Sequence, residues 1–271
     1  MGGMETTMMI LRNIKEYTSK RKAELKEQVS AMAAAPRLAI IQVGTIEAST
    51  RYVRNKIKDC EEIGIEAHWY GYEEFYTTEE LIVEIRDLVP FYDGLIVQLP
   101  LPKHIDATKV LAAIPVEKDV DGFQYGSPFN PATPQGIMNY LKYCNFDLCG
   151  ANVVVIGRSD IVGKPMARML TDANATVTLC HSKTRHLYSH IFNADLVVCA
   201  VGKAKFLNCY PISVPVIDVG INFDEDGKMC GDCYNTEKKD VTPVPGGVGL
   251  LTRCALLENV IKAKELQNDI K

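Results

Sequence analysis

The chain has 271 residues, of which 47% are hydrophobic and 24% charged, and its formal net charge is −4. This is the composition of a soluble globular protein with one large or two ordinary domains, without the basic excess that indicates a nucleic-acid partner. No apolar run approaches the roughly 18 residues of a membrane span. The N-terminus also lacks the basic and apolar regions of a secretory signal, so we expect a cytoplasmic protein.

The first half of the sequence alternates between helical and strand patterns. Short β-branched apolar runs predict buried strands, whereas apolar residues that recur every three or four positions predict helices. The alternation predicts a parallel sheet with helical crossovers. The expected elements are a helix at 5–33, a strand at 37–43, a helix at 48–63, a strand at 65–70, a helix that opens with a capping box at 77–80, and a strand at 94–99.

The composition changes over residues 122–136, which hold three glycines and three prolines and indicate a linker. A helix at 135–143 then leads into a second series of strands joined by helices, which is the pattern of a doubly wound fold. The expected strands lie at 152–156, 175–180, 195–200 and 215–220.

A proline- and glycine-rich loop at 243–249 precedes a final helix that we expect to begin at residue 250. The glycines let the backbone approach a ligand closely, or they form a domain hinge. We predict a two-domain α/β protein with a catalytic cleft between the domains. Residues 1–125 form the first domain, on which the helix at 250–271 packs, and residues 126–249 form a Rossmann-type domain with a doubly wound parallel sheet.

Tyr52 and Lys56 are four residues apart, so they share one helix face, where a phenol can tune a lysine that exchanges protons. The alternative is a solvated helix face. Gln98 ends a buried strand and can bind a heterocycle through its amide, or it can satisfy its own loop. Asp121 stands before a glycine and is either functional or part of a turn.

The turn after the strand at 152–156 indicates a phosphate site. Gly157-Arg158-Ser159 and Gly163 join this strand to the next helix, so backbone N–H groups and a positive helix end face an anion. The spacing is Gly-x5-Gly rather than the more usual G-x-G-x-x-G. The alternative is an ordinary strand-turn-helix unit with a basic surface loop.

The strand at 175–180 is followed by His181-Ser182-Lys183-Thr184-Arg185. Sites for NAD usually have Asp or Glu at this strand end, where the carboxylate binds the ribose 2′-hydroxyl. Hydroxyls, a histidine and two cations suit a 2′-phosphate instead. We therefore predict NADP rather than NAD.

Nine cysteines, an odd number, are typical of thiols in a reducing compartment rather than of a disulfide framework. Cys230 and Cys233 form a lone C-x-x-C pair in a polar loop. One pair cannot complete a tetrahedral zinc site, and a redox pair normally opens a helix. We therefore expect no metal site.

Seven segments, in collinear order across residues 36–262, resemble those of one enzyme family, the bifunctional methylenetetrahydrofolate dehydrogenase/methenyltetrahydrofolate cyclohydrolases. Several of the motifs are long and specific. The segments are Ala48–Lys56, Asp93–Pro102, Lys118–Phe123, Gly157–Pro165, Ala175–Ser182, Ile217–Asn222 and Thr242–Gly249.

The resemblance implies oxidation of 5,10-methylenetetrahydrofolate with NADP and hydrolysis of the product to 10-formyltetrahydrofolate, in one-carbon metabolism and purine biosynthesis. It also implies a homodimer built on the second domain. Lys56 would be the catalytic acid/base, Tyr52 would orient it, Gln98 would support it and the folate, and Asp121 would bind the pterin N–H groups.

The same resemblance implies two sets of binding residues. The folate would also contact Val53, Val97, Leu99, Pro245, Gly246, Gly247 and Gly249. The cofactor would be held by Gly157, Arg158, Ser159, His181, Ser182 and Ile221.

The chain departs from the family pattern at several positions, none of which is a proposed catalytic residue. The segment 124–130 is unusually short, Ala132 replaces a cysteine, Leu250 replaces a proline, and Ile46-Glu47 replaces Asp-Pro. These changes motivate an alternative function, an NADP-binding regulatory or scaffold homologue that has lost one or both activities. A related amino-acid dehydrogenase would need other substrate-side residues.

Overall fold

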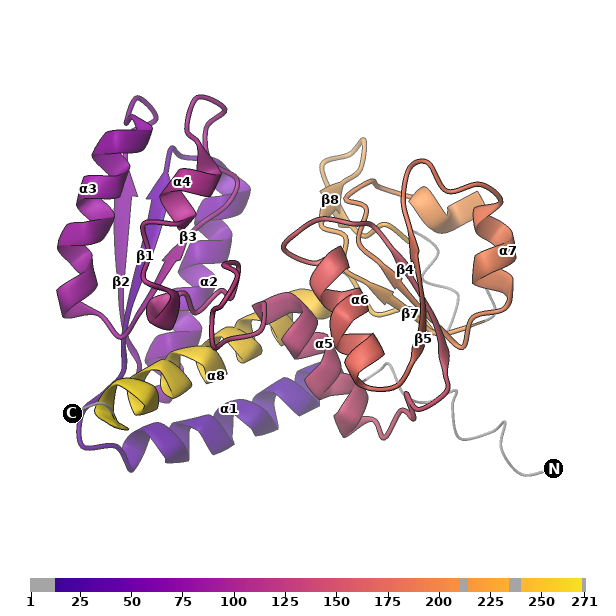
Figure 1. The fold of residues 1–271 in the computed structure, drawn as a ribbon, viewed down its shortest axis with the longest axis horizontal. Coiled ribbons are helices and arrows are strands. Elements are labelled where there is room, and N and C mark those ends of the chain that lie inside the picture. The colour runs from indigo at the N-terminus through magenta and orange to yellow at the C-terminus, as the bar shows by residue number, and fades with distance from the viewer. Residues whose placement is uncertain (1–12, 210–213, 234–239, 270–271) are drawn as a thin grey trace. The chain divides into compact units, whose positions relative to one another are not determined.

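The structure, a computed structural model, describes residues 13–209, 214–233 and 240–269. The described chain forms two compact units, each built from two stretches of sequence. The first unit takes residues 13–19 and 133–252, and the second takes residues 20–132 and 253–269. Each unit has its own parallel sheet (Figure 1), as the alternating pattern predicted. No helix in the described ranges combines the length and apolarity needed to cross a membrane.

The second unit is built on a three-stranded parallel sheet with the order β2-β1-β3. Its elements are most of α1 (Ile14–Ser30), β1 (Arg37–Val43), α2 (Glu47–Ile63), β2 (Glu66–Tyr72), α3 (Thr78–Leu88), a 3-10 turn (Val89–Phe91), β3 (Gly94–Val97), α4 (Ala107–Leu111), a second 3-10 turn (Val116–Lys118) and most of α8 (Val248–Asp269).

Strand side chains of this unit alternate between two apolar layers, because successive residues point to opposite faces of a sheet. Leu38 and Ile40 pack with α2, α1 and α8 on one face. Ala39 and Ile41 pack with α3 and α4 on the other. Figure 1 shows α2 and α3 on opposite sides of the sheet.

The predicted capping box is confirmed at α3. The Thr77 hydroxyl accepts from the Glu80 N–H at 3.2 Å, and the Glu80 carboxylate accepts from the Thr77 N–H at 2.8 Å. The predicted element boundaries were less accurate. β2 continues to Tyr72 because that residue pairs with Val43 at the end of β1. Of the helix predicted at 5–33, residues 1–12 lie outside the described residues, and α1 covers Ile14–Ser30.

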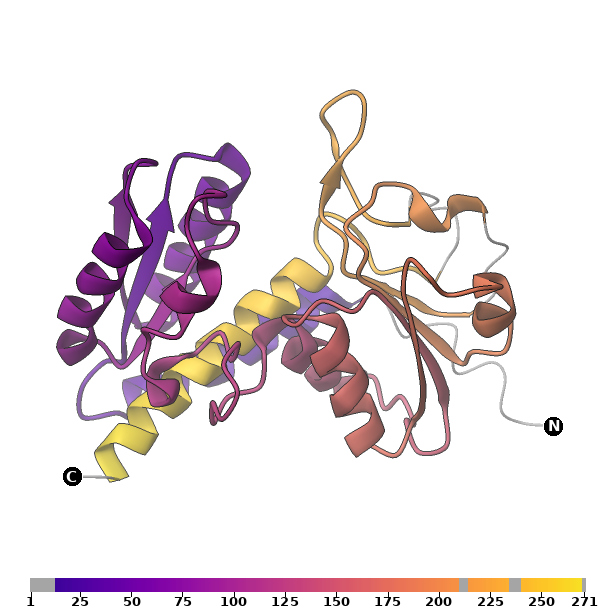
Figure 2. The same ribbon diagram turned by 45° about the horizontal axis from the view of Figure 1, so that its top comes forward.

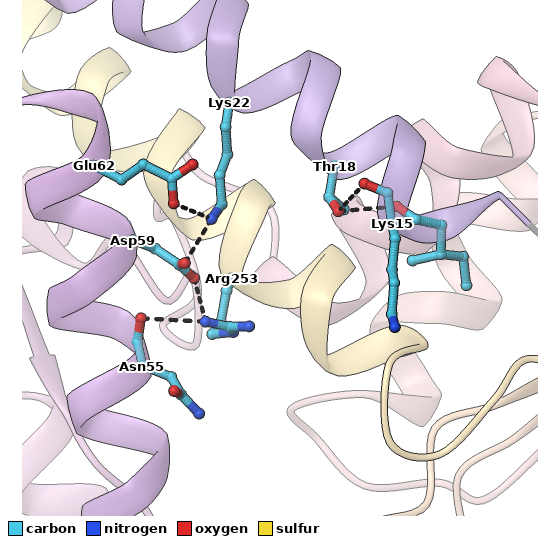
Figure 3. Close-up of polar contacts among 8 residues, drawn as sticks. Lys15, Thr18, Lys22, Asn55, Asp59, Glu62 and Arg253 are labelled. Atoms are coloured by element: carbon cyan, nitrogen blue, oxygen red, sulfur yellow. Dashed lines mark hydrogen bonds and ion pairs between the residues drawn. The ribbon is translucent and has the colours of Figure 1, made fainter.

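Three helices of the second unit meet at Asp59 (Figure 3). One carboxylate oxygen of this buried residue accepts from Nζ of Lys22 at 2.7 Å, and the other pairs with Nη1 of Arg253. Lys22 also contacts Glu62, whose side chain is 51% exposed. Asp59 thus carries the only strongly buried carboxylate of this four-residue cluster, and it links α2 to α1 and α8.

We expect Asp59→Ala to lower the free energy of unfolding by about 3 kcal/mol, because it leaves two partly buried cations without their shared partner. Glu62→Ala is the matched control, since it removes a carboxylate that also contacts Lys22 but is exposed. Its expected cost is about 0.5 kcal/mol. Urea unfolding followed by circular dichroism measures both values, and equal costs would contradict the role of burial.

The first unit contains a four-stranded parallel sheet with the order β5-β4-β6-β7. A short antiparallel hairpin, β8–β9, follows it, and the hairpin tip extends away from the sheet at the top of Figure 2. The elements are α5 (Ala132–Tyr143), β4 (Asn152–Ile156), α6 (Gly163–Asp172), β5 (Thr176–Cys180), α7 (Leu187–Phe192), β6 (Leu196–Cys199), a 3-10 turn (Phe206–Cys209), β7 (Val216–Asp218), β8 (Asn222–Phe223) and β9 (Met229–Cys230).

Helices cover both faces of this sheet. Val153 and Val155 of β4 pack with α5 and α6, whereas Val154 and Ile156 pack in a second layer that includes α7. β5 and β6 lie on either side of β4, so the chain reverses its direction of travel across the sheet at β4. Ligands of doubly wound sheets bind outside the carboxyl ends of the strands at such a reversal.

Candidate active site

Tyr52 and Lys56 lie on α2 and face each other across one helical turn. Nζ of Lys56 is 5.2 Å from the centre of the Tyr52 ring, within the range of a cation–π contact. Lys56 is 5% exposed, although lysine is seldom buried. The face that carries this pair is therefore not the solvated surface of the alternative interpretation.

Asp121 provides the negative charge that acts on Lys56. This carboxylate is 9% exposed and follows a 3-10 turn and an isolated bridge between Asp119 and Leu95 of β3. Burial lowers the pKa of Lys56 because the ammonium loses hydration, and Asp121 partly restores it. Burial likewise raises the pKa of Asp121, and Lys56 opposes that rise. Each charge thus favours the other in a site whose burial disfavours both.

We expect Asp121→Asn to lower the pKa of Lys56, because the substitution removes the anion that favours the ammonium. The pH dependence of reductive methylation of Lys56, followed by mass spectrometry, measures this pKa. Asp87→Asn, an exposed carboxylate on α3 of the same unit, is the control and should leave it unchanged. An unchanged or raised pKa in Asp121→Asn would contradict the coupling.

Gln98 directly follows β3, and its backbone N–H donates to Ile41 O at 2.7 Å. Its side-chain Nε2 donates to Leu99 O at 2.8 Å, while its Oε1 is buried without a hydrogen-bond partner. An unpaired buried acceptor is costly unless a ligand satisfies it. Because the Asp119–Leu95 bridge is parallel, Asp121 lies toward the same sheet edge as Gln98.

The other predicted folate contacts occupy varied positions. Val53 and Val97 are fully buried in the two apolar layers of the second unit, so their side chains serve its core, whereas Leu99 is half-buried. In the first unit, Pro245 is exposed and Gly246 has a φ of +96°.

The glycines of the predicted loop 243–249 have different surroundings. A Cβ at Gly247 would overlap the carbonyl oxygen of Pro243. Gly249 lies within the first turn of α8, which begins at Val248 rather than at the predicted residue 250. Val248 and Leu251 pack in the core of the first unit, and this packing outweighs the low helix propensity of glycine.

The turn after β4 forms a backbone cradle in the first unit. Gly157 has a φ of +118°, and a Cβ there would overlap Ala200 O. A Cβ on Gly163 would overlap Gly157 O. The Ser159 hydroxyl accepts from the Gly163 N–H at 3.3 Å and so supports the start of α6. Ala200 was not predicted from the sequence to be part of this cradle. Its position directly after β6 is the feature that could have indicated it.

The remaining predicted cofactor residues also follow strand ends. Arg158 and Ser182 are exposed, and Ile221, after β7, is 53% exposed. His181 follows β5, where its backbone N–H donates to the Thr184 hydroxyl at 2.8 Å and its ring Nδ1 accepts from a backbone N–H. The six predicted residues thus follow β4, β5 and β7, and the glycine cradle fits a dinucleotide phosphate because a side chain would fill it.

Cys230 and Cys233 behave as structural residues. Cys230 is buried in β9, and the Cys233 N–H donates to the carboxylate of Asp218 at 2.8 Å. Within the described ranges, no group of three or more His, Cys, Asp or Glu side chains is arranged to hold a metal ion.

Comparison with known proteins matches both parts of the chain. Residues 13–121 match the catalytic domain of tetrahydrofolate dehydrogenase/cyclohydrolase, and residues 131–268 match its NAD(P)-binding domain. The bifunctional protein FolD of Burkholderia lata is 48% identical over 268 residues, which cover 92% of this chain and 94% of that protein.

Two solved structures of similar proteins extend the comparison. The bifunctional FolD enzyme of Campylobacter jejuni is 40% identical with a TM-score of 0.88, covering 94% of this chain and 98% of that one. The Trypanosoma brucei dehydrogenase-cyclohydrolase, complexed with NADP and an inhibitor, is 30% identical with a TM-score of 0.86, covering 93% and 96%.

Proposed function

The chain belongs to the tetrahydrofolate dehydrogenase/cyclohydrolase family, and from this premise we propose that it is a bifunctional enzyme of folate metabolism. It oxidises 5,10-methylenetetrahydrofolate to 5,10-methenyltetrahydrofolate with NADP and hydrolyses the product to 10-formyltetrahydrofolate. The observation that carries this proposal is the buried Lys56, with Tyr52 against its ammonium and Asp121 acting on its charge.

Lys56 serves both steps as the proton-transfer group. Burial favours its neutral amine, which can accept a proton from the water that attacks the methenyl carbon. Tyr52 limits the positions that the lysine side chain adopts. The unpaired Oε1 of Gln98 accepts a hydrogen bond from the folate or from Lys56 once substrate is present. Asp121 accepts hydrogen bonds from the pterin amino and ring N–H groups.

NADP, when bound, supplies the hydride acceptor of the dehydrogenase step. Gly157 and Gly163 leave space for its phosphates at the start of α6, and Arg158, Ser159, His181 and Ser182 supply the polar contacts. Ile221 offers an apolar surface for a ring. The loop at Pro245, Gly246, Gly247 and Gly249 covers the folate, which also lies against Leu99 and the backbone of Val53 and Val97, whose side chains are in the core.

We assign folate binding to residues 1–125 with the helix at 250–271, and cofactor binding to residues 126–249. The two units of the described chain support a boundary near residue 132 and a final helix that joins the folate-binding part from residue 253, although they group residues 13–19 with the cofactor-binding part. We further propose that the enzyme is a cytoplasmic homodimer that supplies one-carbon units for purine biosynthesis.

A spectroscopic assay tests the proposed function. Wild-type protein with methylenetetrahydrofolate and NADP should produce methenyltetrahydrofolate and NADPH, and added methenyltetrahydrofolate should be hydrolysed without cofactor. Binding of NADP without binding or turnover of folate would favour the regulatory or scaffold homologue. Size-exclusion chromatography with light scattering tests the dimer, and a monomer at working concentration would contradict it.

We expect Arg158→Ala to weaken NADP binding about tenfold and NAD binding much less, because a guanidinium pairs with the 2′-phosphate that only NADP carries. Titration calorimetry with both dinucleotides measures the two affinities. Arg168→Ala, which removes an exposed cation from α6 nearby in the sequence, should change neither. Equal weakening of both dinucleotides by Arg158→Ala would contradict the 2′-phosphate assignment.

A further inference from the structure

The segment 200–203 lies beside the glycine cradle of the first unit. It directly follows β6, which neighbours β4 at the reversal point of the sheet. Ala200 N–H donates to Ile156 O at 2.8 Å, and Ala200 O lies where a side chain on Gly157 would be. The conformation of this segment therefore sets one wall of the cradle.

One buried carboxylate holds this segment. Asp232 is 0% exposed, and it accepts hydrogen bonds from three successive backbone N–H groups. Oδ2 accepts from Val201 at 2.8 Å and Gly202 at 3.2 Å, and Oδ1 accepts from Lys203 at 2.8 Å. Charge-assisted hydrogen bonds to a buried carboxylate are stronger than neutral ones, so they fix the backbone firmly.

The same carboxylate also contacts the β8–β9 hairpin. Oδ1 accepts from Nδ2 of Asn222 at 3.0 Å, and Asn222 is the neighbour of Ile221, a predicted cofactor contact. Asp232 itself is held in place, because its backbone N–H donates to Asp218 at 3.0 Å. Side chains on Gly220 and Gly231 would overlap these two carboxylates.

From this geometry we propose that Asp232 is a positioning residue for NADP binding. Its carboxylate orders the segment 200–203 and the start of the β8–β9 hairpin, and both border the predicted dinucleotide site. The Gly-Asp pair inside the C-x-x-C sequence thus has a function that the two cysteines do not explain. The inference rests on the proposed NADP-dependent activity.

Asp232→Asn tests the proposal, since the amide keeps the size of the side chain but removes its charge and replaces one acceptor with a donor. We expect the KM for NADP and its dissociation constant by titration calorimetry to rise about tenfold. The kcat at saturating NADP should stay within about twofold, and hydrolysis of methenyltetrahydrofolate, which needs no cofactor, should be unchanged. Amide hydrogen exchange at 201–203 should accelerate.

The matched control is Asp224→Asn in the turn of the same hairpin. Asp224 is half-buried, its carboxylate accepts from the nearby N–H groups of Asp226 and Lys228, and asparagine preserves such a turn. Its NADP affinity should equal that of wild type. Asn222→Ala is a milder variant to be used if Asp232→Asn does not fold, and its KM for NADP should rise about threefold.

The outcomes separate this inference from the proposed function. A wild-type protein that neither binds NADP nor turns over folate would contradict the proposed function itself. An active wild type, with unchanged NADP affinity in folded Asp232→Asn or in Asn222→Ala, would overturn only the role of Asp232. An equal loss of affinity in Asp224→Asn would also overturn it, because charge alone would then explain the effect.

Discussion

Lys56→Met should reduce both the dehydrogenase and the cyclohydrolase rates by about 10³-fold, the size expected for loss of a general acid/base group. Methionine retains an unbranched stem of similar length, and the buried site imposes a desolvation cost on the lysine ammonium. The variant should therefore fold. Calorimetric titration should show NADP affinity equal to that of wild type.

Lys58→Met is the control for this substitution. Lys58 lies on the same helix but is exposed, so the change in charge and residue type is the same while the buried pair is intact. Both of its rates should match those of wild type. If Lys56→Met lost only one of the two activities, a single proton-transfer group for both reactions would be excluded.

Gly157→Ala should weaken NADP binding about a hundredfold, near 3 kcal/mol, because the methyl group overlaps Ala200 O and the φ of +118° is strained for any residue but glycine. Dehydrogenase activity at moderate NADP should fall accordingly. Hydrolysis of methenyltetrahydrofolate should persist, since that reaction needs no cofactor. Steady-state rates of both reactions and calorimetric titration measure these effects.

Gly150→Ala separates backbone strain from steric overlap. Gly150 precedes the opposite end of β4 and also has a positive φ, +76°, but no atom lies within 4 Å of an added Cβ. It should lower stability by about 1 kcal/mol and leave NADP affinity unchanged. Equal loss of affinity in both variants would show that the cradle at Gly157 has no particular role.

The sequence predicted the α/β architecture because its strongest signals are local. The run at 152–156 and the capping box at Thr77 act through neighbouring residues, and both were confirmed. Boundaries that depend on partners were less accurate. The start of α8 at Val248 depends on packing against the first unit's core, and the end of β2 depends on pairing with Val43.

The candidate site was predictable only where residues form a local motif. Spacing placed Tyr52 and Lys56 on one helix face, and the structure confirms that they are in contact. The effect of Asp121 on Lys56 arises between segments far apart in the sequence, so neither the spacing nor the resemblance to known enzymes predicted it. The role of Asp232 was not predicted because its three backbone donors lie about thirty residues away in the sequence. The C-x-x-C pattern that contains it was considered only as a metal or redox pair.

A crystal structure with a folate analogue and NADP bound would measure the position of the Lys56 amine directly. We predict Nζ of Lys56 within about 3 Å of the atoms that bear the one-carbon unit or of a water beside them, with the pterin on Asp121. An Nζ directed into bulk solvent, distant from both the pterin and the nicotinamide, would contradict the assignment of Lys56 as the catalytic group.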